Sequence, residues 1–374
     1  MAVVYTKSEK KNIIIRVVLL AILLVVIVVC VVIIVNQVKT KSGIQKISND
    51  SAVHKGELSD FSLNYYLDED NIARNQILLE REYANAFDKI YELITPYEDI
   101  NYIHNIKYIN EHINEEIKID SILYDYLKLV YELNPYYILQ TPNYNFWKDI
   151  IYISDTKQRE LLDPINNIDS KNEIDYFIND SINYISLEFL NDNIIKLNVD
   201  PNYKTICEDN MYISFNSFYD AIIMDYIKKE LNNNGHTDGY IASINGYYLD
   251  LGMTSKTNYI VLRSNEYKEG YYSLQAKKNY SYITIFDFKV STYYPYYEIN
   301  DLKRTLFLNQ NTGYSYDIKP SVYYDNMGII NTLDNLYKYF NNDIKTNYIL
   351  LDNNKIKTND ESIKSDKYEV VYEK

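Results

Sequence analysis

The residues of this chain that could do chemistry are scattered and form no recognised catalytic motif. The sequence contains no phosphate-binding loop, no CxxC pair, no zinc-binding HExxH and no GxSxG nucleophile elbow. The two closest of the four histidines, His104 and His112, are eight residues apart, which is not metal-ligand spacing on one helical face. Glu98 and Asp99 could act as an acid or a base, although a solvated acidic turn explains them more simply. Residue chemistry alone therefore indicates no particular reaction.

The elements that would position these residues are helices and strands in no regular alternation, which favours an α+β fold. Apolar residues at helical spacing predict helices over 72–94, 122–133, 219–231 and 329–340. Alternating or β-branched runs predict strands over 61–67, 117–119, 184–190, 194–199, 211–215, 239–251, 258–263, 271–277, 280–288, 305–308, 348–351 and 368–372. The polar stretch 155–180 predicts a loop with a short helix, and Asn309 to Gly313 has the composition of a tight turn.

Composition excludes some classes of partner. The chain of 374 residues has a net charge of −14, so a nucleic acid is not an expected partner. Its 43 tyrosines accompany many Asn, Ile and Lys residues, a bias that codon supply in an AT-rich genome would produce. We therefore expect most of these tyrosines to be core or half-buried strand residues, with a tyrosine-rich binding surface as the alternative.

The N-terminal segment predicts a single membrane span. Residues 13–35 are apolar except for Arg16, and the nineteen residues from Val17 to Val35 are uninterrupted, enough to cross the hydrocarbon core of a bilayer. Basic residues are slightly more concentrated before the span than after it, which favours a cytoplasmic segment 1–12. Residues 36–58 then form a polar linker, and 59–374 an extracytoplasmic domain. Cys207 is the only cysteine beyond the span, so that region can form no internal disulfide.

Several segments, taken in order, resemble the conserved motifs of the ApbE-type FAD:protein FMN transferases. MYISFNSFYDAIIMDY is similar to the family's "ldLGGIAKGYAvD", and GYIASINGYYLDLG to "aliniGGni-x-x-lG". VSTYYPYYE resembles "vaTSGdYer", TLFLNQNTGYS resembles "HiidPrTGyp", and IINTLDNLYKYF resembles "laDalaTalf". These matches extend in collinear order over about residues 60 to 345, and matching positions include Pro142, Trp147, Asp225, Thr292, Tyr296, Thr312 and Gly313.

The resemblance implies an ApbE-like, T-fold-related domain with mixed or antiparallel sheets and packed helices. It also implies an activity, the Mg²⁺-assisted transfer of FMN from FAD onto a threonine hydroxyl of an extracytoplasmic partner protein. FAD and Mg²⁺ are thus the cofactors to expect if the family's chemistry is retained. By the same resemblance, the residues expected around the cofactor are Asp99, Tyr219, Thr292, Leu306, Thr312 and Gly313.

The residues that carry the family's chemistry are replaced in this chain. The lysine of the central motif corresponds to Asp220, the aspartate beside it to Ser214, and the first glycine of the glycine pair to Asn245. The histidine before the family's Asp-Pro turn corresponds to Leu306, and that aspartate to Asn309. Replacing the lysine and the histidine removes groups that would neutralise a pyrophosphate, so reduced or lost catalysis is expected.

The family's metal-binding Asp and Thr correspond to Asn331 and Asn335. The two residues keep the i,i+4 spacing, so both side-chain oxygens could face the same way and bind Mg²⁺ without contributing charge. They also lie nearly opposite the apolar stripe of their predicted helix, so two solvated asparagines are an equally simple interpretation.

Two hypotheses follow from the sequence. In the first, the chain is a membrane-anchored ApbE-like protein with degenerate catalytic residues, a pseudoenzyme that has either kept or lost flavin binding. In the second, it is a non-catalytic scaffold or interaction protein on the outer face of the membrane.

Overall fold

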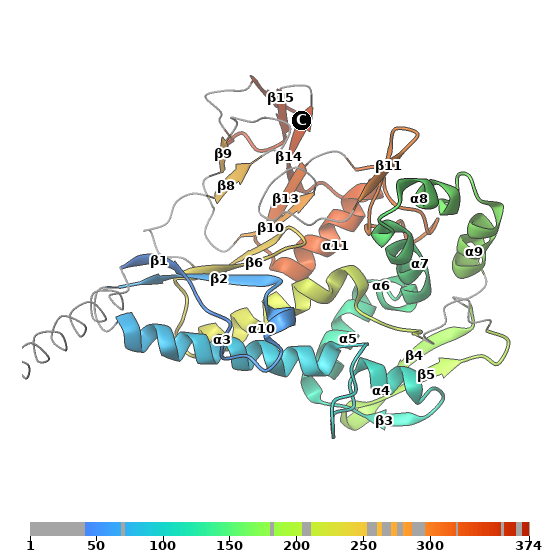
Figure 1. Ribbon diagram of the computed structural model, residues 1–374, viewed down its shortest axis with the longest axis horizontal. Helices are drawn as coiled ribbons and strands as arrows, with labels where there is room; N and C mark the ends of the chain where they lie inside the picture. Colours follow the sequence, from blue (N-terminus) through green and yellow to red (C-terminus); the bar gives the residue numbers. More distant parts are fainter. Residues whose placement is uncertain are drawn as a thin grey trace, which may run out of the picture. The chain divides into compact units, whose positions relative to one another are not determined.

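Figure 1 shows the computed structural model of the chain. It describes residues 42–68, 72–179, 183–203, 211–252, 260–263, 271–274, 280–285, 296–318, 321–352, 355–363 and 369–373. The predicted cytoplasmic segment 1–12 and membrane span 13–35 lie outside these residues, as does the predicted site residue Thr292. Within the described ranges, no helix is both long enough and apolar enough to cross a membrane.

The chain divides into two compact units. The smaller unit comprises residues 1–45 and 66–78, and its described part contains most of β1 (Gly43–Lys46), the end of β2 (Phe61–Leu67) and the start of α3 (Ile72–Ile94). The larger unit comprises residues 46–65 and 79–374 and holds everything discussed below. The short helix α2 (Lys55–Leu58), with Leu58 fully buried, lies within the segment predicted as a linker.

The main sheet of the larger unit has the strand order β2-β6-β7-β10-β13-β14-β15-β16. Neighbouring strands are antiparallel except for the parallel pair β15–β16, so the sheet is mixed, as predicted. Its other strands are β6 (Gly239–Ser243), β7 (Tyr247–Asp250), β10 (Ser281–Ile285), β13 (Ser321–Asp325), β14 (Asn347–Asp352), β15 (Lys355–Thr358) and β16 (Glu369–Tyr372). The segment 239–251, predicted to be strand, forms β6 and β7 joined by a turn that contains Asn245 and Gly246.

Both faces of this sheet are covered. In β13, Tyr323 points into the larger hydrophobic cluster, while Val322 and Tyr324 point into a smaller cluster on the opposite face, as the alternation of side chains along a strand requires. The helices α10 (Tyr219–Asn233) and α11 (Ile329–Phe340) cover the first face and pack against each other (Figure 1).

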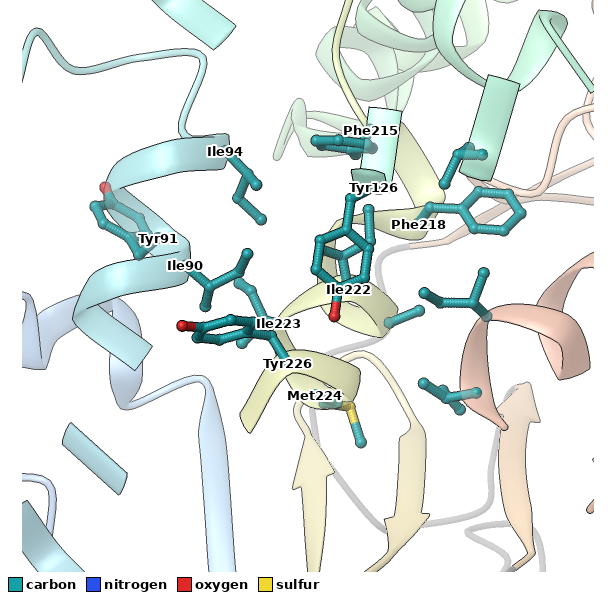
Figure 2. Packing of buried hydrophobic residues seen from close by; sticks show 14 of the residues in the cluster. Ile90, Tyr91, Ile94, Tyr126, Phe215, Phe218, Ile222, Ile223, Met224 and Tyr226 are labelled. Atoms are coloured by element: carbon teal, nitrogen blue, oxygen red, sulfur yellow. The ribbon is translucent and has the colours of Figure 1, made fainter. Parts of the chain in front are cut away.

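The core is built around α10. Figure 2 shows Ile223 of α10 beside Ile90 of α3. Both side chains are fully buried, as are their neighbours Ile222 and Ile94. Phe218, just before α10, belongs to the same cluster. The helical periodicity predicted for residues 72–94, 219–231 and 329–340 therefore corresponds to real buried faces.

The remaining helices and strands surround this core. The helices are α4 (Ile106–Glu111), α5 (Ser121–Leu133), α6 (Tyr136–Leu139), α7 (Thr141–Tyr152), α8 (Thr156–Leu162) and α9 (Ile168–Asn179). A small sheet has the order β3-β5-β4, from β3 (Glu116–Lys118), β4 (Ile185–Phe189) and β5 (Ile194–Val199). Two further hairpins pair β8 (Ile260–Arg263) with β9 (Tyr271–Leu274) and β11 (Tyr297–Ile299) with β12 (Leu302–Arg304). This mixture confirms the predicted α+β class.

Two predicted strands are wrong, and each has a physical reason. Residues 305–308 do not form a strand. The strand pairing involves the residues just before them, because β12 (Leu302–Arg304) pairs with β11. Residues 211–215 are buried but irregular, because the side chain of Asn110 takes the place of a neighbouring strand. Its Oδ1 accepts hydrogen bonds from the backbone N–H groups of Tyr212 (2.9 Å) and Ile213 (3.0 Å), and its Nδ2 donates to the carbonyl of Ile213 (2.9 Å).

The polar stretch 155–180 holds two helices, α8 and α9, where the sequence predicts mostly loop. Asp155 caps α8 by accepting hydrogen bonds from the backbone N–H groups of Lys157 and Gln158. In α9, Ile174 is fully buried beside Trp147 and other members of a separate hydrophobic cluster. α8 has no buried residue and α9 has few, and such a pattern gives little periodicity in the sequence.

Candidate functional site

A cavity of about 400 Å³ opens in the larger unit, a volume within the usual range for a small-molecule site. Its walls come from α3, α7, the start of α10 and the β6–β7 turn, together with short segments near residues 57–61, 96–98, 214–217 and 306. The lining residues are Glu57, Asp60, Phe61, Phe87, Tyr91, Pro96, Tyr97, Glu98, Tyr144, Asn145, Lys148, Tyr152, Ser214, Asn216, Ser217, Tyr219, Asp220, Ile223, Asn245, Tyr247 and Leu306.

Asp220, in the first turn of α10, provides a buried carboxylate in the cavity wall. Its residue surface is only 8% exposed. Asn245 in the β6–β7 turn donates a hydrogen bond from Nδ2 to Asp220 Oδ2 at 2.9 Å. Burial raises the pKa of Asp220 and the Asp60 carboxylate raises it further, against the lowering effect of hydrogen bonds from Ser243 and Asn245. Keeping the Asp220 carboxylate ionised in the cavity wall therefore costs free energy.

Two more acids lie on the same wall. Burial raises the pKa of Asp60, and the negative charge of Glu57 raises it further. Glu98, on the segment after α3, accepts a hydrogen bond from the hydroxyl of Tyr91 at 2.9 Å. The cavity therefore has an acidic lining drawn from three separate segments of the chain.

Tyrosines form much of the remaining wall. Burial raises the pKa of Tyr144 and of Tyr219, so both hydroxyls stay neutral at physiological pH. The hydroxyl of Tyr247 donates to the carbonyl of Ser217 at 2.9 Å, which fixes its ring against the start of α10. Tyr97 and Tyr152 are more exposed, at 56% and 60%.

The lining has one basic side chain, Lys148 on α7. Its Nζ donates to the hydroxyl of Tyr97 at 2.7 Å and lies 4.9 Å from the centre of that ring. The lysine is thus engaged with an aromatic ring and forms no salt bridge to the acids of the wall in the part of the chain that is described.

Tyr219 and Leu306, two of the residues that the resemblance places around the cofactor, line the cavity. Ser214, Asp220 and Asn245, the positions at which the sequence has replaced the family's Asp, Lys and Gly, line it as well. Five positions of the collinear resemblance thus lie at one cavity, even though the residue types differ from those of the family.

Asp99 lies outside the lining. Its side chain is 74% exposed and lies 3.7 Å from the Nζ of Lys107, while its neighbour Glu98 lines the cavity. The sequence therefore places the correct segment at the site, but the residue within it that faces the cavity is the other member of the acidic pair.

Thr312 and Gly313 also lie outside the lining and belong to a packed turn. The Gly313 carbonyl accepts hydrogen bonds from Trp147 Nε1 at 2.8 Å and Asn143 Nδ2 at 3.1 Å. Gly313 has a φ of 72°, and a Cβ at this position would lie 2.6 Å from the side chain of Ile178. Glycine is needed here for backbone conformation and space, which explains its presence without a ligand.

Asn331 and Asn335 do not line the cavity. Asn331 donates from Nδ2 to the Met327 carbonyl at 3.0 Å, and Asn335 donates from Nδ2 to Asp325 Oδ2 at 2.9 Å. Both are partly exposed on α11, so the geometry favours two local hydrogen-bonding side chains. Among the residues the structure describes, no three His, Cys, Asp or Glu side chains are grouped to hold a metal ion.

Several lining residues are not identified by the sequence: Glu57, Asp60, Tyr91, Tyr97, Tyr144, Lys148 and Tyr152. They lie on segments far apart in the chain, and each residue type is common in this acidic, tyrosine-rich sequence. The one available signal is the pair of flanking motifs, which places the start of α10 and the β6–β7 turn at the site.

Comparison with solved structures identifies the fold. A point mutant of the flavin transferase ApbE from Vibrio cholerae superposes with a TM-score of 0.53 at 12% identity over 85% of this chain and 97% of that chain. The ApbE protein of Thermotoga maritima gives 0.50 at 11% identity over 83% and 94%. The apo form of Pseudomonas stutzeri flavinyl transferase ApbE gives 0.50 at 10% identity over 78% and 88%. No protein-family model and no curated protein matches the sequence.

This chain therefore has an ApbE-like fold, as the order of its motifs predicts. At identities of 10–12%, the likeness is one of fold and leaves the chemistry to be judged from the residues present.

Those residues do not fit FAD with Mg²⁺. The diphosphate of FAD is anionic, whereas the described lining has four carboxylic acids and one lysine, and the asparagines at the family's metal positions lie outside it. Repulsion between a buried carboxylate and a phosphate at short range is several-fold stronger than it would be in water. Among the described residues, the cavity lining thus has a single cation, Lys148, to set against a pyrophosphate.

Proposed function

We propose that this protein is a membrane-anchored, extracytoplasmic pseudoenzyme of ApbE-like fold, in which the cavity binds a ligand but FMN is not transferred. One observation carries the proposal: Asp220 lies buried in the cavity wall where the flavin transferases' pattern has a lysine. This substitution reverses the charge at a central position of the site.

The chemical reason is electrostatic. Transfer of a nucleotidyl group from a diphosphate develops negative charge on oxygens that cations must stabilise. In this chain, a carboxylate replaces the lysine, Leu306 replaces the histidine, and amides replace the metal-binding Asp and Thr. Loss of a single such group typically costs a hundredfold or more in rate, so losing several together supports the absence of turnover.

The proposed location rests on the sequence. Nineteen apolar residues, Val17 to Val35, follow a basic segment, and this arrangement favours an anchor with the N-terminus in the cytoplasm. A partner in the extracytoplasmic space, whether a flavin-accepting protein or another, would then reach the cavity of the larger unit.

The test is an FMN-transfer assay with the full-length chain purified in detergent. The chain is incubated with FAD, Mg²⁺ and an acceptor protein that the Vibrio cholerae flavin transferase modifies, and flavin fluorescence of the acceptor band is measured. We expect a signal below about one-thousandth of that given by the wild-type Vibrio enzyme. Transfer within about tenfold of that enzyme would overturn the proposal.

A matched variant separates charge from shape. Asp220→Lys restores the cation of the flavin transferases' pattern at one position, so FAD binding, measured by quenching of flavin fluorescence, should rise relative to the wild-type chain. Asp99→Lys introduces the same charge outside the lining and should leave FAD binding unchanged. Equal effects of the two variants would show that the buried position has no special role.

A further inference from the structure

We propose that the cavity binds a small organic cation, such as a quaternary or primary ammonium compound, through carboxylates and tyrosine ring faces. This inference rests on the proposed function, because it assigns a class of ligand to the same site.

The carboxylates of the cavity lack a countercharge from lysine or arginine. Glu57, Asp60, Glu98 and Asp220 line the cavity, and none of them forms an ion pair with a lysine or arginine in the described part of the chain. The Nδ1 of His54 lies 3.9 Å from Glu98 Oε2. Asp220 is the buried member of the four, while Glu57 and Asp60 are exposed to solvent and Glu98 is partly exposed. Because buried carboxylates are normally paired with a cation, a positively charged ligand would supply the partner that Asp220 lacks.

Aromatic residues form much of the cavity wall. Tyr91, Tyr144, Tyr219 and Tyr247 line the cavity beside Phe61 and Phe87. The faces of aromatic rings attract cations, and aromatic walls combined with a carboxylate are the usual way in which proteins recognise substituted ammonium groups. Burial raises the pKa of the Tyr144 and Tyr219 hydroxyls, so these residues add no further negative charge.

The Asp220 carboxylate is held in a fixed position. Asn245 holds one carboxylate oxygen at 2.9 Å, and the side chain belongs to the first turn of α10, one of the most buried helices. The negative charge therefore cannot move out to solvent. A cation entering the cavity would meet a preorganised carboxylate, which lowers the cost of binding.

The lysine at the cavity does not offset these groups. Lys148 is held at the rim by Tyr97, through the 2.7 Å hydrogen bond and the ring contact. This pair shows within the protein itself that an ammonium group is accommodated by a tyrosine of the lining.

The experiment measures binding of choline and tetramethylammonium to the full-length chain by isothermal titration calorimetry. The neutral carbon isostere of choline, 3,3-dimethylbutan-1-ol, has nearly the same shape without the charge. We expect choline to bind at least about tenfold more tightly than the isostere. Equal affinities, or no saturable binding of either cation up to about 10 mM, would overturn the inference.

Variants localise the effect. Asp220→Asn keeps the shape and the hydrogen bond from Asn245 but removes the charge, so choline affinity should fall about tenfold or more. Glu98→Gln should weaken binding as well, whereas Asp99→Asn, next in the chain but outside the lining, should not. Thermal unfolding of each variant checks that it is folded. Unchanged choline affinity in a folded Asp220→Asn protein would contradict the inference.

The two proposals fail in different ways. If the chain neither transfers FMN nor binds an organic cation, the proposed ligand is wrong and the loss of FMN transfer stands. If the chain binds the cation and also transfers FMN, the proposed loss of catalysis is wrong and the ligand stands.

Discussion

Asp220 is a buried carboxylate without a cationic partner among the described residues, and its charge lowers the stability of the fold. Because its pKa is raised on folding, protonation favours the folded state. The favourable contribution is present in full below the unfolded pKa of about 3.9 and is lost as the pH rises through the folded pKa. At neutral pH the folded chain therefore carries a penalty that a neutral side chain would not.

This penalty can be measured. Asp220→Asn should raise the melting temperature at pH 7 by on the order of a few degrees, and its advantage should disappear below about pH 4. Thermal unfolding followed by circular dichroism across this pH range provides the measurement. Asp99→Asn, at an exposed position, is the matched control and should change little. A stabilisation independent of pH would mean that the charge is not its cause.

At the scale of single residues, sequence and structure agree on position more than on role. Tyr219 and Leu306, which the resemblance places around the cofactor, line the cavity, and the replaced motif positions Ser214, Asp220 and Asn245 line it too. Gly313 illustrates the opposite case. Its motif is shared with flavin transferases, but in this chain its carbonyl is bound by Trp147 and Asn143 and its Cα faces Ile178.

Among the elements, the β11–β12 hairpin is bound to the end of α8 by a buried ion pair. Arg304 donates from Nε to Asp163 Oδ2 at 2.9 Å and from Nη2 to Oδ1 at 3.1 Å, and Asp163 is fully buried just after α8. The hydroxyl of Tyr297 donates to Asp163 Oδ2 at 2.6 Å, and the Arg304 guanidinium lies 5.2 Å from the Trp147 ring. The hairpin is thereby joined to α7 and α8.

Breaking this pair should be costly. Arg304→Met leaves the Asp163 carboxylate buried without its cationic partner, and we expect a loss of about 3–5 kcal/mol in the free energy of unfolding. Urea denaturation of the full-length chain measures it. The double variant Arg304→Met with Asp163→Asn removes both charges and should recover a large part of the loss. If the double variant were as unstable as the single one, an unpaired charge would not be the cause.

Helices and strands with a clear period were predictable, and those held by side-chain hydrogen bonds were not. The periodic segments 72–94 and 329–340 form α3 and α11 with the predicted bounds. The segment 211–215 has the composition of a strand, but Asn110 satisfies its backbone through a side chain about a hundred residues away in sequence. Such a long-range contact leaves no local pattern to recognise.

At the scale of the whole molecule, the prediction concerns the anchor. The full-length chain should sediment with membranes and resist extraction by alkaline carbonate, whereas a chain beginning at residue 37 should remain in the supernatant, because it lacks the nineteen apolar residues. Immunoblotting of the fractions measures the distribution. Val25→Asp with Val26→Asp provides a control of full length. Sedimentation of the shortened chain would place the membrane attachment elsewhere.

The single tryptophan gives this protein its own optical probe. Trp147 is fully buried on α7, with its indole N–H bonded to the Gly313 carbonyl and the Arg304 guanidinium near its ring. Since Tyr144 and Lys148 on the same helix line the cavity, the indole lies next to the site without belonging to it. Tryptophan emission from this chain, excited at wavelengths that tyrosine does not absorb, therefore comes from one location, where the turn, the hairpin and a cavity-lining helix meet.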